Sequence, residues 1–168
     1  MTDPVTPASA STRWSKALVS VVLVAVAGIA VAHDFKVGAL VIDHPYALPT
    51  PGGVRNGAAY FRSISNTGAA PDRLIGASTP VATSVEFHRS KMDGNVMRMR
   101  AIDGIALPAG SDVKMRHDGE LHLMLMGVKE PLTVGMRFPM VLRFEHTGEL
   151  EVSVGVQKPS VRDAGHTH

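Results

Sequence analysis

The chain has 168 residues, 45% of them hydrophobic, and its 17 basic and 15 acidic residues give a formal net charge of +2. This length is that of a single domain, and a near-neutral chain without a basic stripe is not expected to bind nucleic acid. Cysteine is absent, which excludes disulfides, thiolate zinc sites, blue-copper sites and cysteine nucleophiles.

The N-terminus has the pattern of an export signal. Residues 17–32 are uncharged and mostly apolar, they follow Arg13 and Lys16, and Ala30-Val31-Ala32 fits a small-x-small cleavage site. The apolar run is shorter than the roughly 20 residues of a membrane span. We predict a signal peptide over 1–32, with an uncleaved N-terminal anchor as the alternative, and a periplasmic location.

Short strands separated by turns fill the rest of the chain, and the 16 glycines and 11 prolines are spread along it. No segment after residue 32 has a sustained 3.6-residue periodicity. This pattern predicts an all-β domain over 33–156, a Greek-key β-barrel or sandwich, followed by a flexible polar tail over 157–168. The expected strands are, in chain order, 36–44, 57–66, 73–79, 81–89, 96–102, 113–127, 137–146 and 149–156.

Histidine and methionine recur at period two on three of these strands, and such residues share one face. A turn at residues 93–95 would pair 81–89 with 96–102 as a hairpin and bring His88 near Met99. Eight of the nine methionines lie between residues 92 and 140, a clustering that core filling alone does not explain. The residues on these faces are His88; Met97 and Met99; and His122, Met124 and Met126.

These side chains suit monovalent copper. Thioether sulfur is a soft, neutral donor that favours Cu(I) and is a poor ligand for Zn²⁺, Mg²⁺ or Ca²⁺, while imidazole also binds copper well. Such donors hold copper outside the cytoplasm without an oxidisable thiolate.

The order of these residues is specific. His88 is followed by ten residues and Met99, then by 22 residues and the triplet His122-Leu123-Met124. This order resembles the PCuA(C) family of periplasmic copper chaperones, whose signature is His, ten residues, Met, about 21 residues and His-x-Met. The second spacing is one residue longer here, and we expect the additional residue in the turn region 104–119. The resemblance covers about residues 36–156, with further similarity in 44–53, 66–82, 97–104 and 121–135.

The resemblance implies a cupredoxin-like fold without the blue-copper cysteine. It also implies Cu(I) bound near the surface by His88, Met99, His122 and Met124. The family is associated with delivery of copper to the dinuclear copper centre of cytochrome c oxidase. The implied partner is therefore subunit II of the oxidase or a thioredoxin-like assembly factor, and we expect a monomer.

Two other functions are compatible with the sequence. One is a copper-buffering or resistance protein without a delivery target, and the other is a metal-free β-sandwich adhesion or assembly module with a methionine-rich core. An enzyme is not expected, because there is no GxSxG motif and no acid/base pair of carboxylates. A closed four-ligand Cu(I) site also leaves no open position for a substrate.

The other histidines and methionines have separate expectations. We predict that Met97 and Met126 pack around the ligands and limit access of water and oxidants, or serve as spare ligands. We expect a solvent-facing His117 with at most an accessory role, a buried and hydrogen-bonded His44, and an ordinary His146. Core or rim positions are predicted for Met92, Met115, Met136 and Met140, and candidate Cu(II) ligands are His33 with a free α-amine, and His166 with His168 in the tail.

Overall fold

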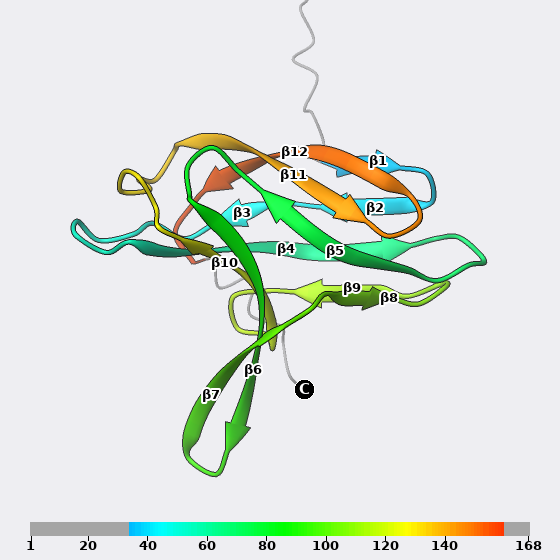
Figure 1. The fold of residues 1–168 in the computed structure, drawn as a ribbon, viewed down its shortest axis with the longest axis horizontal. Coiled ribbons are helices and arrows are strands. Elements are labelled where there is room, and N and C mark those ends of the chain that lie inside the picture. Colours follow the sequence, from blue (N-terminus) through cyan, green and yellow to red (C-terminus); the bar gives the residue numbers. More distant parts are fainter. Residues whose placement is uncertain (1–33, 160–168) are drawn as a thin grey trace, which may run out of the picture. The chain divides into compact units, whose positions relative to one another are not determined.

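The structure is a computed structural model that describes residues 34–159. Within this range it is all-β, as predicted, with twelve strands and no helix (Figure 1). The strands are β1 (Asp34–Val37), β2 (Leu40–Asp43), β3 (Tyr46–Ala47), β4 (Asn56–Asn66), β5 (Asp72–Ser78), β6 (Ser84–Asp93), β7 (Val96–Ile102), β8 (Ile105–Leu107), β9 (Asp112–Met115), β10 (Leu121–Met126), β11 (Arg137–Phe144) and β12 (Gly148–Val156).

The strands form an open sheet that curves around one core. Neighbouring strands follow the order β7-β6-β10-β4-β3-β12-β11-β5-β8, and β2 and β9 also pair with the long strand β4. Most pairs are antiparallel, whereas β12 and β3 run parallel. Because β7 and β8 end the strand order, the sheet has free edges, and β7 pairs only with β6 among the described strands.

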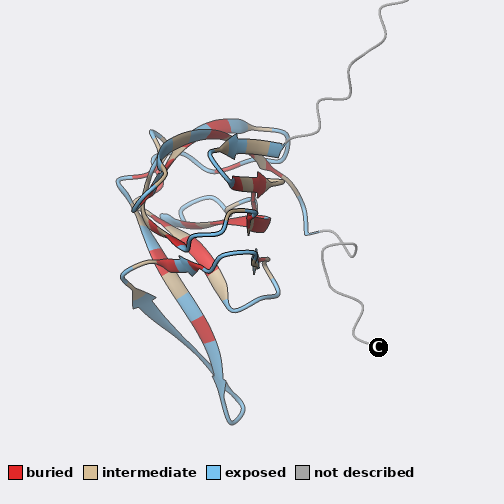
Figure 2. Cartoon of the chain, turned by 90° about the vertical axis from the view of Figure 1, so that its right-hand side faces the viewer, coloured by how far each residue is buried: buried red, intermediate tan, exposed pale blue. Residues whose placement is uncertain are grey.

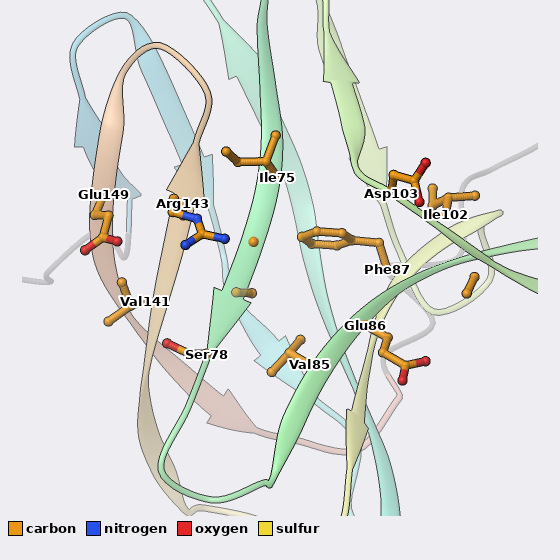
Figure 3. A pocket seen from close by; sticks show the side chains of 13 residues that line it. Ile75, Ser78, Val85, Glu86, Phe87, Ile102, Asp103, Val141, Arg143 and Glu149 are labelled. Atoms are coloured by element: carbon orange, nitrogen blue, oxygen red, sulfur yellow. The ribbon is translucent and has the colours of Figure 1, made fainter.

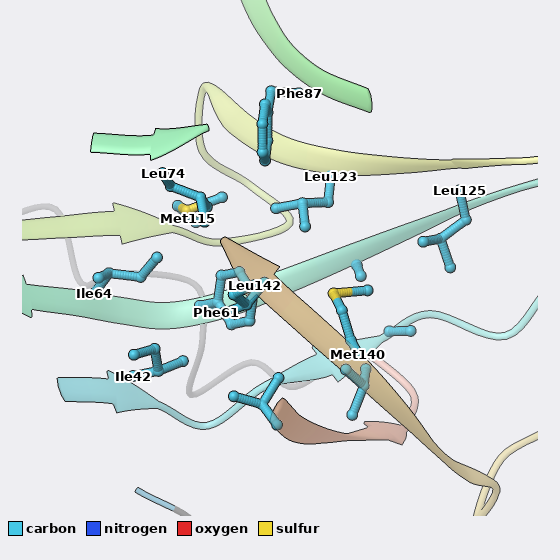
Figure 4. Close-up of a cluster of buried hydrophobic side chains, with 14 of the residues drawn as sticks. Ile42, Phe61, Ile64, Leu74, Phe87, Met115, Leu123, Leu125, Met140 and Leu142 are labelled. Carbon is cyan, nitrogen blue, oxygen red and sulfur yellow. The ribbon is translucent and has the colours of Figure 1, made fainter. Parts of the chain in front are cut away.

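Alternating apolar residues on the strands form the core. On β10, Leu123 and Leu125 are fully buried, and on β11 the buried residues include Met140 and Leu142. Figure 4 shows these side chains meeting Phe61 of β4 across the interior. On β10 the leucines that alternate with His122, Met124 and Met126 therefore form the inward face.

Two predicted strands are each divided in two. Residues 36–44 form β1 and β2, because Gly38 adopts a positive φ of 55° and turns the chain into a hairpin. Residues 113–127 form β9 and β10, since the segment between them turns the chain, with a bond of 3.0 Å from Gly119 N–H to the Arg116 carbonyl. The short strands β3 and β8 were not predicted.

A buried carboxylate fixes the start of β5 to the turn between β11 and β12. Asp72 accepts hydrogen bonds from the main-chain N–H groups of Arg73 (2.7 Å), His146 (3.1 Å) and Thr147 (3.0 Å) and from the Thr147 hydroxyl. Burial alone would raise the pKa of Asp72, but these bonds together outweigh burial and lower it. Asp72 therefore contributes stability as an anion.

The β6–β7 hairpin extends beyond the rest of the sheet (Figure 1). Its turn contains Gly94 with a φ of 60°, a conformation that glycine adopts without strain. Figure 2 shows that most of the hairpin is exposed, in contrast to the strands around the core. The predicted pairing of this hairpin is confirmed.

The predicted signal peptide over 1–32 and residues 160–168 of the predicted tail lie outside the described residues. Within 34–159, no helix has the length and apolar character to cross a membrane.

Candidate metal centre

Two histidines face each other on adjacent strands. His88 of β6 and His122 of β10 are direct partners in the antiparallel register, so their side chains point to the same face. The ring centroids are 5.8 Å apart and the ring planes are inclined by 53°. Pairing between β6 and β10 thus joins two imidazoles that are far apart in the sequence.

The two candidate methionines flank this pair on the same face. Met124 is paired with Glu86, which lies two residues before His88 on β6. Met99 of β7 is paired with Ser90, which lies two residues after His88 on β6, and Met99 is 54% exposed. Diagonal neighbours on one face are about 7–8 Å apart, within the reach of long side chains. The sheet therefore places all four predicted ligands on one continuous surface.

The surroundings of His88 leave one ring nitrogen available for a ligand. Its Nε2 lies 3.0 Å from Oε2 of Glu86, so we assign the proton to Nε2, which donates to the carboxylate. Its Nδ1 is buried and has no hydrogen-bond partner among the described residues. Metal-binding histidines commonly have this arrangement, in which one nitrogen donates to a carboxylate and the other binds the metal. A metal at Nδ1 would also remove the cost of an unsatisfied buried polar atom, about 1–3 kcal/mol.

His122 is held in its neutral form. Its side chain is 5% exposed, and its pKa is lowered first by burial and then by the proximity of His88. The ring also lies beside Tyr60 of β4, with 6.1 Å between centroids. A neutral imidazole carries the lone pair that binds a metal, so no proton has to leave before binding at neutral pH.

A metal on this face would need the thioethers. Among residues 34–159, no group of three or more His, Cys, Asp or Glu side chains is arranged to hold a metal ion. The His88–His122 pair supplies two donors, and further protein donors have to come from methionine.

A separate cleft of about 500 Å³ lies where β5 and β11 approach β6 (Figure 3). Its lining includes Ile75, Phe87 and Arg143. Phe87 alternates with His88 along β6 and lines this cleft, but Glu86, which bonds to His88, lines it too, so the cleft borders the imidazole pair at Glu86.

The structure narrows or corrects three expectations about other residues. Met92 is 55% exposed, which excludes the core position and leaves the rim position. Met97 is 60% exposed, which argues against packing around the ligands and leaves the alternative of a spare ligand. His117 is not simply solvent-facing, because its main-chain N–H donates to the Tyr46 hydroxyl, which also lies 3.1 Å from its Nδ1.

Other expectations about histidines and methionines are confirmed, and three of the residues concerned lie outside the described range. Met115 and Met140 are fully buried core residues as predicted. The predicted hydrogen bond of His44 is present, from Nε2 to Gln157 Oε1 at 3.1 Å, although the side chain is only partly buried. Met126 and Met136 are partly buried and His146 is exposed. The candidate Cu(II) ligands His33, His166 and His168 lie outside the described residues.

Alternation along β6 places Glu86 on the face of His88, but sequence reasoning assigned it no role, and it missed Tyr60. The hydrogen bond between Glu86 and His88 is seen only in the structure. Tyr60 approaches His122 only because β4 pairs with β10, and no local pattern signals that pairing.

Known proteins with similar sequences are described as lipoproteins. The family model "Putative lipoprotein LpqE-like" matches residues 40–156. A protein of Leifsonia xyli subsp. xyli, named "Putative lipoprotein Lxx21020", is 33% identical over 100 residues. This match covers 59% of the present chain and 60% of that relative's length.

Solved structures with the same fold are PCuAC domains. The copper-bound PCuAC domain from PmoF2 is 31% identical, with a TM-score of 0.66 over 76% of this chain and 99% of that domain. The solution structure of CuI-DR1885 from Deinococcus radiodurans is 28% identical, with a TM-score of 0.56 over 77% of this chain and 83% of that one. The predicted cupredoxin-like fold is thereby confirmed. The chain belongs to the LpqE-like family, and its β-domain is a PCuAC domain.

Proposed function

We propose that this protein binds Cu(I) through His88, Met99, His122 and Met124 and transfers it to an acceptor protein outside the cytoplasm. The observation that carries the proposal is the opposed His88–His122 pair with a thioether on either side. Support also comes from similar structures described as a copper-bound PCuAC domain and as CuI-DR1885.

The donor set suits a protein that releases its copper. Four neutral ligands leave the bound ion with a charge of +1, and Glu86 lies behind His88 to balance part of that charge. The half-exposed Met99 sits on the outer strand of the group, so it is the ligand that solvent or an incoming partner reaches first. A thiolate or imidazole of the acceptor can replace Met99 before the buried His122 dissociates from the copper. The ion therefore stays bound to protein throughout the transfer.

We propose that the acceptor is the dinuclear copper centre of cytochrome c oxidase, reached directly through subunit II or through a thioredoxin-like assembly factor. The role is binding and transfer rather than catalysis. A copper-buffering protein would have the same site, so a deletion strain distinguishes the two. Loss of oxidase activity that added copper restores supports delivery, whereas copper sensitivity with normal oxidase activity supports buffering.

We propose that the protein is exported. The predicted signal over 1–32 and the description of relatives as lipoproteins both support export. Residues 1–168 contain no cysteine, so a lipid cannot be attached to a thiol of this chain. Anchoring would instead use the apolar segment 17–32. Cell fractionation of the full chain tests this proposal, and recovery in the cytoplasm alone contradicts it.

Competition for Cu(I) against a chromogenic chelator tests the proposed site. We expect the full chain to withdraw one Cu(I) from the chelator and the His122→Ala, Met124→Ala double variant to lose this capacity. A control variant, His146→Ala with Met136→Ala, removes the same two side-chain types away from the site and should compete like the wild type. Equal competition by the wild type and the His122→Ala, Met124→Ala variant would show that the site is wrongly assigned.

A further inference from the structure

The two faces of the β6–β7 hairpin have different chemistry. Direct pairing places Met92 opposite Met97 and Met99 opposite Ser90, so the three methionines share one face, named here the thioether face. The opposite face is mainly cationic and comprises Arg89, Lys91, Arg98 and Arg100 together with Asp93 and Val96; Asp93 pairs with Arg98 at 2.8 Å.

The thioether face is exposed to an unusual degree. Met92, Met97 and Met99 are 55%, 60% and 54% exposed, although methionine is normally a core residue. Val96 is equally exposed but lies on the cationic face. Every exposed large apolar side chain on the thioether face is therefore a sulfur donor. A surface that served only for apolar contact would accept leucine or valine equally well, so the restriction to methionine indicates a role for sulfur.

The register places the outer methionines too far from the histidines to share one ion with them. Met92 is four residues from His88 along β6, or roughly 13 Å of strand. Met97 is directly opposed to Met92, with their Cβ atoms about 4.5–5.5 Å apart, close enough for both sulfurs to reach one ion. Met99, which pairs with Ser90, lies between the Met92–Met97 pair and His88 on the same face.

We propose that Met92 and Met97 form a second, outer Cu(I) site, and that Met99 moves between it and the His88–His122 site. The role of this outer site in copper transfer rests on the function proposed above, because the His88–His122 site, named here the inner site, has to supply or receive the ion. The oxidation state of copper does not change, because one copper–sulfur coordination bond forms as another breaks. Two neutral donors bind Cu(I) more weakly than four, so the outer site is a loading and release position at the tip of the hairpin. By register the cationic residues belong to the opposite face, although Met92 lines a surface pocket together with Arg89, Lys91, Arg98 and Arg100.

Titration of the full chain with Ag(I), a redox-stable soft monovalent probe, tests this proposal. Methionine methyl groups labelled with ¹³C report each sulfur separately by NMR, and single Met→Leu variants assign the signals. We expect the first equivalent to shift Met99 and Met124 and a second equivalent to shift Met92 and Met97. The fully buried Met140 is the internal control and should not shift.

Two variants separate the outer site from the inner one. The Met92→Leu, Met97→Leu variant should lose the second equivalent and retain the first. The His122→Ala, Met124→Ala variant should still show the Met92 and Met97 shifts. If Met92 and Met97 do not respond, or respond only together with Met99 in one saturable step, the outer site is disproved while the inner site stands. If Met99 and Met124 do not respond, the proposed function fails, whatever the outer methionines do.

Discussion

Substitution of Glu86 by glutamine tests whether the Glu86 carboxylate orients the His88 imidazole and attracts an ion bound at Nδ1. The Glu86 carboxylate accepts a hydrogen bond from Nε2 at 3.0 Å, and its side chain is 47% exposed. Glutamine has the same shape and its carbonyl can still accept this bond, but the negative charge is lost. The hydrogen bond then loses about 1 kcal/mol of charge assistance.

The charge also acts on the ion itself. An ion at Nδ1 lies roughly 7 Å from the carboxylate, which in a water-like medium is an attraction of about 0.6 kcal/mol. The hydrogen-bond effect counts only as far as the bond strengthens when the metal binds, so the two effects sum to at most about 1.6 kcal/mol, and Cu(I) should bind up to roughly tenfold more weakly to Glu86→Gln. This value lies at the lower end of the ~10–100-fold range for residues that orient metal ligands, as expected for an exposed carboxylate.

Competition against a chromogenic chelator measures the affinities of the wild type, Glu86→Gln and a control, Glu120→Gln. Glu120 is exposed on the turn before β10, and its described contact is a main-chain one, from Ser90 N–H to the Glu120 carbonyl at 2.7 Å. The control therefore removes the same charge near the site without touching a ligand. Raised salt should reduce the Coulomb part of the Glu86 effect and preserve the hydrogen-bond part. Equal affinity of Glu86→Gln and wild type, or an equal loss in both variants, would refute the role assigned to the Glu86 carboxylate.

Three further predictions concern the fold and its surface. Asp72→Asn should lower the free energy of unfolding by about 2–4 kcal/mol at pH 7 in urea titrations, while exposed Asp118→Asn should leave it unchanged. Because the folded carboxyl has the lower pKa, this difference should shrink as pH falls below about 4, and a constant difference would contradict the anionic role. Leu123→Ala, at a fully buried position, should cost about 2–5 kcal/mol in the same assay, and a loss below about 1 kcal/mol would argue against the packed core. Under hydrogen peroxide, mass spectrometry should find Met97 oxidised well before the buried Met140; similar rates would contradict the exposure of the hairpin.

The surroundings of the candidate site were less predictable than its ligands. Alternation along β6 and β10 is local, so it identified the faces of His88 and His122 directly. Proximity of Tyr60 to His122 depends on the pairing of β4 with β10, which joins residues more than 60 positions apart in the chain. Burial of Nδ1 likewise depends on neighbouring strands, and no local pattern in the chain indicates it.

By itself, the sequence determined which residue types alternate on which strand, and this set the all-β class, the inward leucines of β10 and the soft-donor character of its other face. Only the tertiary structure decided that His122 stands opposite His88, and that Met92 and Met97 stand in solvent instead of in the core. The physical reason is that side-chain direction follows from local backbone geometry, whereas register and exposure depend on which distant strand, if any, packs alongside.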